Sequence, residues 1–142
     1  MPTRTSSAVW EGDLKGGKGK MRLGSGAYEG AYSFQSRFEE GSGTNPEELA
    51  AAAHAGCFSM ALSHGLAQGG HPPTRIETSC TVEFGPKKGG GFEVRSSALE
   101  VKGWVPGLDQ GTFAQAAEAA KNGCPVSGAL KIAMSVQASL QG

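Results

Sequence analysis

One segment of the chain predicts a helix that is apolar or small on every side, and several helix-start signals precede it. Asn45 can cap this helix, Pro46 suits the first helical position, and Glu48 follows Asn45 at the spacing of a capping box. No charged residue then appears before Arg75. We predict a helix from Pro46 to about Ala67, ended by the Gly and Pro residues that follow it.

A helix without a polar face has to be buried all round rather than amphipathic. This helix is too rich in Ala, Ser, Gly and His to be a membrane span, which needs about 20 mostly apolar residues. In a chain of 142 residues, one sheet covers one face of such a helix. We therefore expect a second subunit to cover the other face.

Alternation and turn residues predict the other elements. Aromatic and polar residues alternate over Ala31–Phe38, which predicts a strand with Arg37 on the side opposite Phe38. The other elements expected are a hairpin over Ser6–Lys20, strands at Ile76–Phe84 and Phe92–Val105, a helix at Asp109–Lys121, a short helix opened by Pro125, and a strand at Ile132–Leu140. This order predicts an α+β fold in a single domain, residues 1–142.

Composition argues against several classes of partner. Thirteen basic residues balance thirteen acidic ones, without a basic run or an acidic tail, so neither nucleic acid nor an anionic membrane surface is expected as a partner. The N-terminus has no apolar core of a secretory signal. Three cysteines are an odd number and form no C-x-x-C motif. We expect a cytoplasmic protein with free thiols.

Cys57 lies in the middle of the predicted buried helix, where it is either an inert small hydrophobe or a reactive thiol. The helix dipole acts only on the end turns and gives this thiolate little help. A reactive Cys57 would therefore need a cation brought to it. Arg37 and His54 are the candidates, although His54 by itself is more typical of a hydrogen-bonded core histidine.

Cys124 occupies the predicted cap position before Pro125, where backbone N–H groups favour a thiolate. Local physics therefore gives Cys124 the better claim to a low pKa, although a small residue tolerated at a turn is the alternative. Cys80 is expected as a packed or edge thiol of a strand, and His64 and His71 receive no role. The spacing of histidines and cysteines matches no zinc site, so neither a metal nor a cofactor is expected.

Several runs of residues closely resemble the osmotically inducible protein C (OsmC) family. They are Thr44-Asn45-Pro46-Glu47-Glu48-Leu49, His54-Ala55-Gly56-Cys57-Phe58-Ser59-Met60-Ala61 and Gly123-Cys124-Pro125-Val126-Ser127, with Val9-Trp10-Glu11-Gly12 and Phe34 to Phe38 in addition. The likeness thus extends over nearly the whole chain. It implies an OsmC-like fold, in which an antiparallel sheet packs on a long central helix, and an intertwined homodimer.

The resemblance also implies roles for four residues. Cys57 matches the family's peroxidatic cysteine and Cys124 its resolving cysteine. Arg37 matches the arginine that activates the thiolate, and Glu47 matches the carboxylate partner of that arginine. Cys80 matches no family motif, which leaves it outside the mechanism.

The implied activity is thiol-dependent reduction of organic hydroperoxides to alcohols, in defence against oxidative or osmotic stress. A Cys57 sulfenate and a Cys57–Cys124 disulfide would be the intermediates, and an external dithiol, for which a lipoyl group is one candidate, would restore the thiols. Two alternatives remain open. One is a non-enzymatic, stress-related dimer that binds an apolar ligand, and the other is a disulfide redox sensor.

Helix geometry adds one expectation about the homodimer. Ten residues of helix separate Glu47 from Cys57, a rise of about 15 Å, which is too far for the carboxylate to work beside the thiol of its own chain. We therefore predict that Arg37 and Glu47 of one subunit act on Cys57 of the partner.

Overall fold

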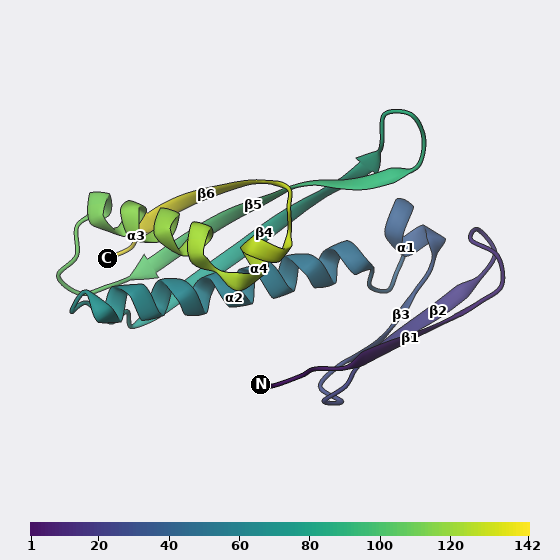
Figure 1. Ribbon diagram of the computed structural model, residues 1–142, viewed down its shortest axis with the longest axis horizontal. Coiled ribbons are helices and arrows are strands. Elements are labelled where there is room, and N and C mark those ends of the chain that lie inside the picture. Colours follow the sequence, from purple (N-terminus) through teal and green to yellow (C-terminus); the bar gives the residue numbers. More distant parts are fainter. The chain divides into compact units, whose positions relative to one another are not determined.

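The elements of the computed structural model, which describes residues 1–142, follow the predicted order with one exception (Figure 1). Along the chain they are β1 (Ser6–Glu11), β2 (Lys18–Leu23), β3 (Glu29–Tyr32), α1 (Phe34–Phe38), α2 (Pro46–Gln68), β4 (Arg75–Pro86), β5 (Phe92–Trp104), α3 (Gln110–Gly123), α4 (Pro125–Ala129) and β6 (Ala133–Leu140). The chain divides into two compact units, Met1–Leu49 and Ala50–Gly142. That these units form one OsmC-like domain stays a prediction.

The first unit contains an antiparallel sheet in the order β1-β2-β3. The predicted N-terminal hairpin is confirmed, with Trp10 of β1 opposite Gly19 of β2 and Tyr32 of β3 on the other side of Gly19. The Trp10 and Tyr32 rings lie 5.3 Å apart across that glycine. A Cβ on Gly19 would overlap both rings, so the absence of a side chain there lets the two aromatic rings meet.

The predicted strand over Ala31–Phe38 is wrong in its second half. Strand β3 ends at Tyr32, and Ser33 caps the helix α1 instead. The Ser33 hydroxyl accepts from the Ser36 backbone N–H, and the Ser36 hydroxyl accepts from the Ser33 N–H. This reciprocal cap stabilises a helical turn, which overrides the alternating pattern. As a result Arg37 does not point away from Phe38, because its guanidinium carbon lies 5.5 Å from the centre of the Phe38 ring.

Helix α2 begins and ends as predicted. The Asn45 side chain accepts from the Glu48 backbone N–H at 2.7 Å, which confirms the cap. The Glu48 carboxylate does not complete a capping box and instead accepts from the Thr44 hydroxyl at 2.6 Å. None of the helices combines the length and apolar character needed to cross a lipid bilayer.

The second unit contains a sheet in the order β4-β5-β6. Strands β4 and β5 form the predicted antiparallel hairpin, whereas β6 runs parallel to β5. The sheet is therefore mixed and not wholly antiparallel. The parallel pair requires a long crossover connection, which α3 and α4 provide between β5 and β6.

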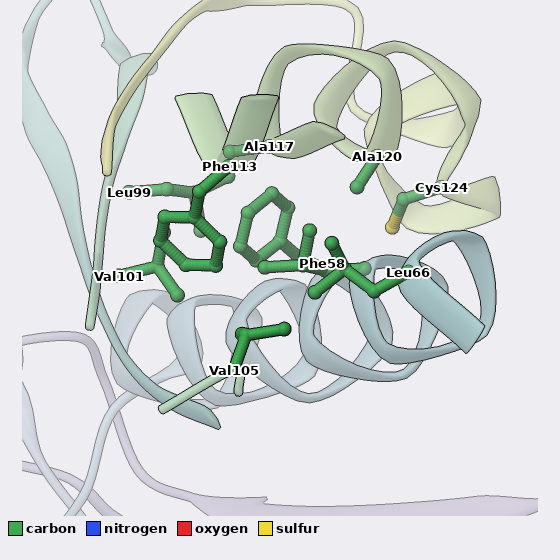
Figure 2. Packing of buried hydrophobic residues seen from close by; sticks show 10 residues of the cluster. Phe58, Leu66, Leu99, Val101, Val105, Phe113, Ala117, Ala120 and Cys124 are labelled. Atoms are coloured by element: carbon green, nitrogen blue, oxygen red, sulfur yellow. The ribbon is translucent and has the colours of Figure 1, made fainter. Parts of the chain in front are cut away.

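The core of the second unit lies between the sheet and the helices α2 and α3, as Figure 2 shows. The rings of Phe58 and Phe113 are fully buried at its centre. The Phe113 ring packs directly against the backbone of Gly103, where a Cβ atom would overlap it. The other buried residues of this core are Leu62, Leu66, Leu99, Val101, Val105, Ala117, Ala120 and Cys124.

Within one chain, α2 is buried on one face only. His54, Phe58, Leu62 and Leu66 follow one another every fourth residue and are all buried. The opposite face, formed by Ala52, Ala53, Gly56 and Met60, is exposed, with 76% of Met60 accessible. The prediction of a helix buried all round therefore does not hold for the single chain. The α+β class is confirmed, and the second subunit over the exposed face stays a prediction.

Candidate active site

The cap of α1 and the start of α2 are tied together by hydrogen bonds. The Ser36 hydroxyl donates to the Thr44 carbonyl at 2.7 Å, and the Asn45 side-chain amide donates to the Ser36 carbonyl at 3.0 Å. Ser36 and Thr44 are buried. These bonds hold the last turn of α1 beside the first turn of α2, and thus bring Arg37 next to Glu47.

Arg37 and Glu47 form a forked ion pair. Arg37 Nη2 donates to Glu47 Oε1 at 2.8 Å, and Arg37 Nε lies 3.2 Å from both carboxylate oxygens. The Glu47 side chain is 10% exposed and that of Arg37 is 33% exposed. A buried carboxylate thus holds the guanidinium by several charge-assisted bonds, while a third of the Arg37 side chain stays accessible. Such an arrangement can present a fixed positive charge to a thiolate or an oxyanion.

Cys57 and Cys124 are free thiols that lie close enough to share a hydrogen bond. Cys57 lies on α2, three residues after His54 and beside the core residue Phe58. Cys124 follows α3 and is the first residue before α4 opens at Pro125, which confirms its predicted cap position. In Figure 2 the Cys124 sulfur points toward α2 from the edge of the core.

The pKa values of the two thiols are shifted in opposite directions. Burial raises the pKa of Cys57, and the hydrogen bond with Cys124 raises it further. Burial opposes ionisation of Cys124 too, but hydrogen bonds from Cys57, from Ser127 and from the Val126 N–H outweigh it, so the Cys124 pKa is lowered. The expectation that Cys124 has the better local claim to a low pKa is therefore confirmed. Within its own chain, Cys57 is a poor thiolate.

His54 is a satisfied core histidine and not a cation beside Cys57. It is fully buried, its Nδ1 lies 2.6 Å from the Ser97 hydroxyl, and its Nε2 lies 2.7 Å from the Ser127 hydroxyl. Burial lowers the pKa of His54, so the ring is neutral near pH 7. His54 is thereby ruled out as the cation that a reactive Cys57 would need.

The other candidate side chains belong to neither of these two pairs. Cys80 is a partly buried thiol of β4, as predicted, and its sulfur lies 3.0 Å from the Ser97 hydroxyl. His64 is exposed on α2, and His71 lies just beyond the end of that helix.

Sequence reasoning missed the contribution of Ser97 and Ser127. Both are buried, and the hydroxyl of each forms a hydrogen bond with one ring nitrogen of His54. A signal was available, because a histidine on the buried face of a helix requires a partner for each nitrogen. The sequence does not say which serines of a glycine- and serine-rich chain provide those partners.

Comparisons with known proteins show the family of the chain. Residues 39–139 match the family model described as OsmC-like protein. The chain belongs to the OsmC family. It is 45% identical over 139 residues to the peroxiredoxin OsmC of Escherichia coli (strain K12), a match that covers 97% of this chain and 96% of that protein. The predicted OsmC membership is thereby confirmed.

Solved structures similar to this one include proteins described as OsmC-like and as organic hydroperoxide resistance proteins. The organic hydroperoxide resistance protein OhrB of Bacillus subtilis superposes with a TM-score of 0.73 and 25% identity, over 96% of this chain and 98% of that one. An OsmC-like protein of Mycoplasma pneumoniae shares the fold at a TM-score of 0.75 and 13% identity, over 99% of both chains. The OsmC-like fold is therefore confirmed.

Proposed function

We propose that this OsmC-family protein is a cysteine-based peroxidase that reduces organic hydroperoxides to alcohols with electrons from an external dithiol. The observation that carries the proposal is the pair of free thiols Cys57 and Cys124, which lie near enough for each to shift the pKa of the other, in a chain 45% identical to a peroxiredoxin. Two thiols in contact can become a disulfide without a large rearrangement, which is what a two-cysteine peroxidase cycle requires.

In the first step, the Cys57 thiolate attacks the distal oxygen of the hydroperoxide ROOH. The O–O bond breaks, an alkoxide leaves and takes up a proton to become the alcohol, and Cys57 becomes a sulfenic acid. In the second step, the Cys124 sulfur attacks the Cys57 sulfur. A disulfide forms, and the sulfenic hydroxyl leaves and takes up a proton from solvent to become water. An external dithiol then reduces the disulfide and is itself oxidised to a disulfide. A lipoyl group is one candidate for this dithiol.

Arg37 and Glu47 would supply the charge that Cys57 lacks within its own unit. Burial raises the Cys57 pKa, so a guanidinium beside its sulfur would favour the thiolate and would stabilise the negative charge on the leaving oxygen. Glu47 would keep the guanidinium in place through the forked ion pair. The Arg37–Glu47 pair therefore fits an activating role better than a merely structural one, since a third of the Arg37 side chain is accessible.

We propose that this charge reaches Cys57 from the partner subunit of a homodimer. The rise of about 15 Å from Glu47 to Cys57 along one helix separates the ion pair from the thiol of the same chain. Antiparallel packing of two α2 helices about a two-fold axis would bring the start of one helix near the middle of the other. The exposed apolar face of α2, with Met60 at its centre, suits such packing.

The surroundings of Cys57 favour substrates with an apolar tail. Met60 and the alanines beside Cys57 on α2 would bind an alkyl group better than a small polar peroxide. In keeping with the free thiols, we propose that the protein works in the cytoplasm, in defence against peroxide stress.

The decisive experiment is a peroxide-consumption assay with a dithiol reductant and cumene hydroperoxide. Wild type should turn over, and Cys57→Ser should lose turnover, because no sulfenic acid can form at residue 57. Cys80→Ser is the matched control and should stay largely active. Near-wild-type activity of Cys57→Ser would contradict the assignment and would make Cys124 the first nucleophile. Absence of turnover in wild type would favour the disulfide sensor if the Cys57–Cys124 disulfide forms, or the apolar ligand-binding dimer if it does not.

Subunit complementation tests the shared site. Heterodimers of Cys57→Ser with Arg37→Ala subunits, co-expressed and selectively purified, would contain one site with both lesions and one site with neither. They should recover about half of the wild-type activity per dimer, while each parent homodimer stays nearly inactive. Heterodimers as inactive as their parents would place all four residues of a site in one chain.

A further inference from the structure

Polar side chains from four elements, β4, β5, α2 and α4, form a chain that leads to Cys124. The Cys80 sulfur of β4 lies 3.0 Å from the Ser97 hydroxyl of β5, and that hydroxyl lies 2.6 Å from His54 Nδ1. His54 Nε2 lies 2.7 Å from the Ser127 hydroxyl of α4, and the Ser127 side chain is close enough to Cys124 to lower the pKa of its thiol. We call Ser97, His54 and Ser127 the relay.

The relay is buried, and its polar atoms all have hydrogen-bond partners. Exposed fractions are 0% for His54, 1% for Ser97, 9% for Ser127 and 1% for Cys124. No buried side-chain nitrogen or oxygen lacks a hydrogen-bond partner. A fully satisfied polar network in an apolar core keeps its members in one geometry, since any broken bond would leave a buried group without a partner.

The neutral His54 ring carries one N–H, so its two hydrogen bonds must differ in direction. If Nε2 carries the proton, it donates to the Ser127 oxygen, and the Ser127 hydroxyl is free to donate onward. If Nδ1 carries the proton, Ser127 donates to Nε2 and can only accept from its other neighbour. The tautomer of His54 therefore decides whether Ser127 presents a donor or an acceptor to Cys124.

A thiolate accepts hydrogen bonds and cannot donate them. Ionised Cys124 therefore requires the first arrangement, with Nε2 protonated and the Ser127 hydroxyl aimed at sulfur. Along the rest of the relay, Ser97 then donates to Nδ1 and accepts from the Cys80 thiol, the titratable group that faces His54 from β4. When Cys124 is a protonated thiol, the donor and acceptor can be exchanged in every hydrogen bond of the relay.

We propose that the relay is a positioning device for the resolving cysteine, in which His54 orients the Ser127 hydroxyl as a donor to the Cys124 thiolate. This inference rests on the proposed function, in which Cys124 attacks the Cys57 sulfenic acid. The donor stabilises Cys124 as the attacking thiolate. It also stabilises Cys124 as the leaving thiolate when the dithiol attacks the Cys57 sulfur, since a lower thiol pKa makes a better leaving group. His54 and Ser97 act through Ser127 and touch neither reacting sulfur.

Ionisation of Cys124 can be followed directly by NMR of protein labelled at cysteine Cβ, in the reduced Cys57→Ser background. Ser127→Ala should raise the Cys124 pKa by about one unit, the size expected for one lost hydrogen bond to a charged group. Ser127→Thr keeps the hydroxyl and should stay near the reference. Ser59→Ala is the matched control, because Ser59 is a part-buried serine of the same helix as His54 whose hydroxyl bonds Ala55 and Thr78 instead.

The two ring positions of His54 allow a second, sharper comparison. Gln at position 54 can place an amide N–H near the Nε2 position and keep the donor to Ser127, whereas Asn reaches only toward Ser97. His54→Gln should therefore shift the Cys124 pKa less than His54→Asn does. Nitrogen NMR of the His54 ring should also show Nε2 carrying the proton once Cys124 is ionised.

Two outcomes would overturn the relay without touching the proposed function. One is a Cys124 pKa in Ser127→Ala equal to that in Ser59→Ala. The other is a His54 tautomer with Nδ1 protonated while Cys124 is a thiolate. Loss of peroxide turnover in wild type would instead overturn the proposed function, and the NMR titrations would still test the relay because they involve no peroxide. If a His54 variant fails to fold, the Ser127 series alone decides.

Discussion

Cys57 and Cys124 belong to the same unit and interact with each other, but their surroundings shift their pKa values in opposite directions. The region around Cys124 supplies neutral donors, namely the Ser127 hydroxyl and backbone N–H groups, which lower its pKa. The region around Cys57 supplies apolar packing that raises its pKa. Under the proposed function, the resolving thiol is thus prepared by its own unit, whereas the peroxidatic thiol would depend on a charge held elsewhere.

The difference follows from where each cysteine stands in its helix. Residue 124 precedes α4, so backbone N–H groups without intrahelical partners lie within its reach. Residue 57 lies in the middle of α2, where every backbone N–H already bonds to a carbonyl one turn earlier. The Val126 backbone N–H lowers the Cys57 pKa but does not outweigh burial, which raises it. In the proposed function the missing charge comes from Arg37 of the Arg37–Glu47 pair. An enzyme built this way would activate its nucleophile only after assembly.

The largest effect that separates the two thiols is expected from Cys124→Ser. This variant should still react once with peroxide, because Cys57 keeps its activating charge, but all turnover through the Cys57–Cys124 disulfide should be lost. Cys57 should stall as a sulfenic acid and over-oxidise to sulfinic acid at excess peroxide. Mass spectrometry of the treated protein measures this. Wild type that shows no Cys57–Cys124 disulfide after one equivalent of peroxide would refute the resolving role.

Arg37→Ala should give the next largest effect, confined to Cys57. Loss of the guanidinium should lower kcat/KM for cumene hydroperoxide near pH 7 by about 100-fold or more, the usual cost of removing one donor to a developing oxyanion. Part of the loss should be recovered at higher pH, where Cys57 ionises without help. Arg37→Lys keeps the positive charge but not the forked hydrogen bonds, so its kcat/KM should lie between those of wild type and Arg37→Ala.

The comparison between the thiols would fail if Arg37→Ala slowed peroxide attack and disulfide formation equally. Single-turnover kinetics separate the two steps, since sulfenic acid formation precedes disulfide formation. An equal effect on both steps would mean that Arg37 supports the fold of the site and does not act on Cys57 alone.

The smallest effect concerns stability and His54. Its native pKa is lowered below the ordinary value of 6.5, so the unfolded chain takes up a proton at a pH where the native ring stays neutral. The contribution of neutral His54 to the free energy of unfolding is therefore fully present above pH 6.5. It falls as the pH drops below that value, by at most about 1.4 kcal/mol per pH unit for one proton. Urea unfolding between pH 7.5 and 5.5, at one protein concentration, measures the slope.

His54→Gln should flatten that slope, because its amide does not titrate. His64→Gln is the matched control, since His64 is exposed on the same helix and should leave the slope as it is in wild type. Equal slopes in wild type and His54→Gln would show that His54 does not titrate on unfolding, and would weaken the argument that the relay is neutral.

Local sequence signals were enough for most of the fold. The cap at Asn45, the break after Gln68, the turn before Pro125 and the strand patterns from Arg75 onward depend on a few neighbouring residues, and these elements were predicted within a few positions. The exception is Phe34–Phe38, where two competing local patterns were both present. The alternation predicted a strand, whereas the reciprocal Ser33–Ser36 cap made a helix.

Motif resemblance named Arg37, Glu47, Cys57 and Cys124, but pairing between side chains far apart in sequence required the tertiary structure. Only the fold shows that the Arg37 turn closes onto Glu47, because this depends on the bonds of Ser36 and Asn45 across the intervening loop. Only packing brings Ser97 and Ser127 to the two nitrogens of His54, 43 and 73 residues away along the chain. A sequence pattern records which residues prefer which local geometry, whereas hydrogen bonds between distant elements are decided by how the core packs.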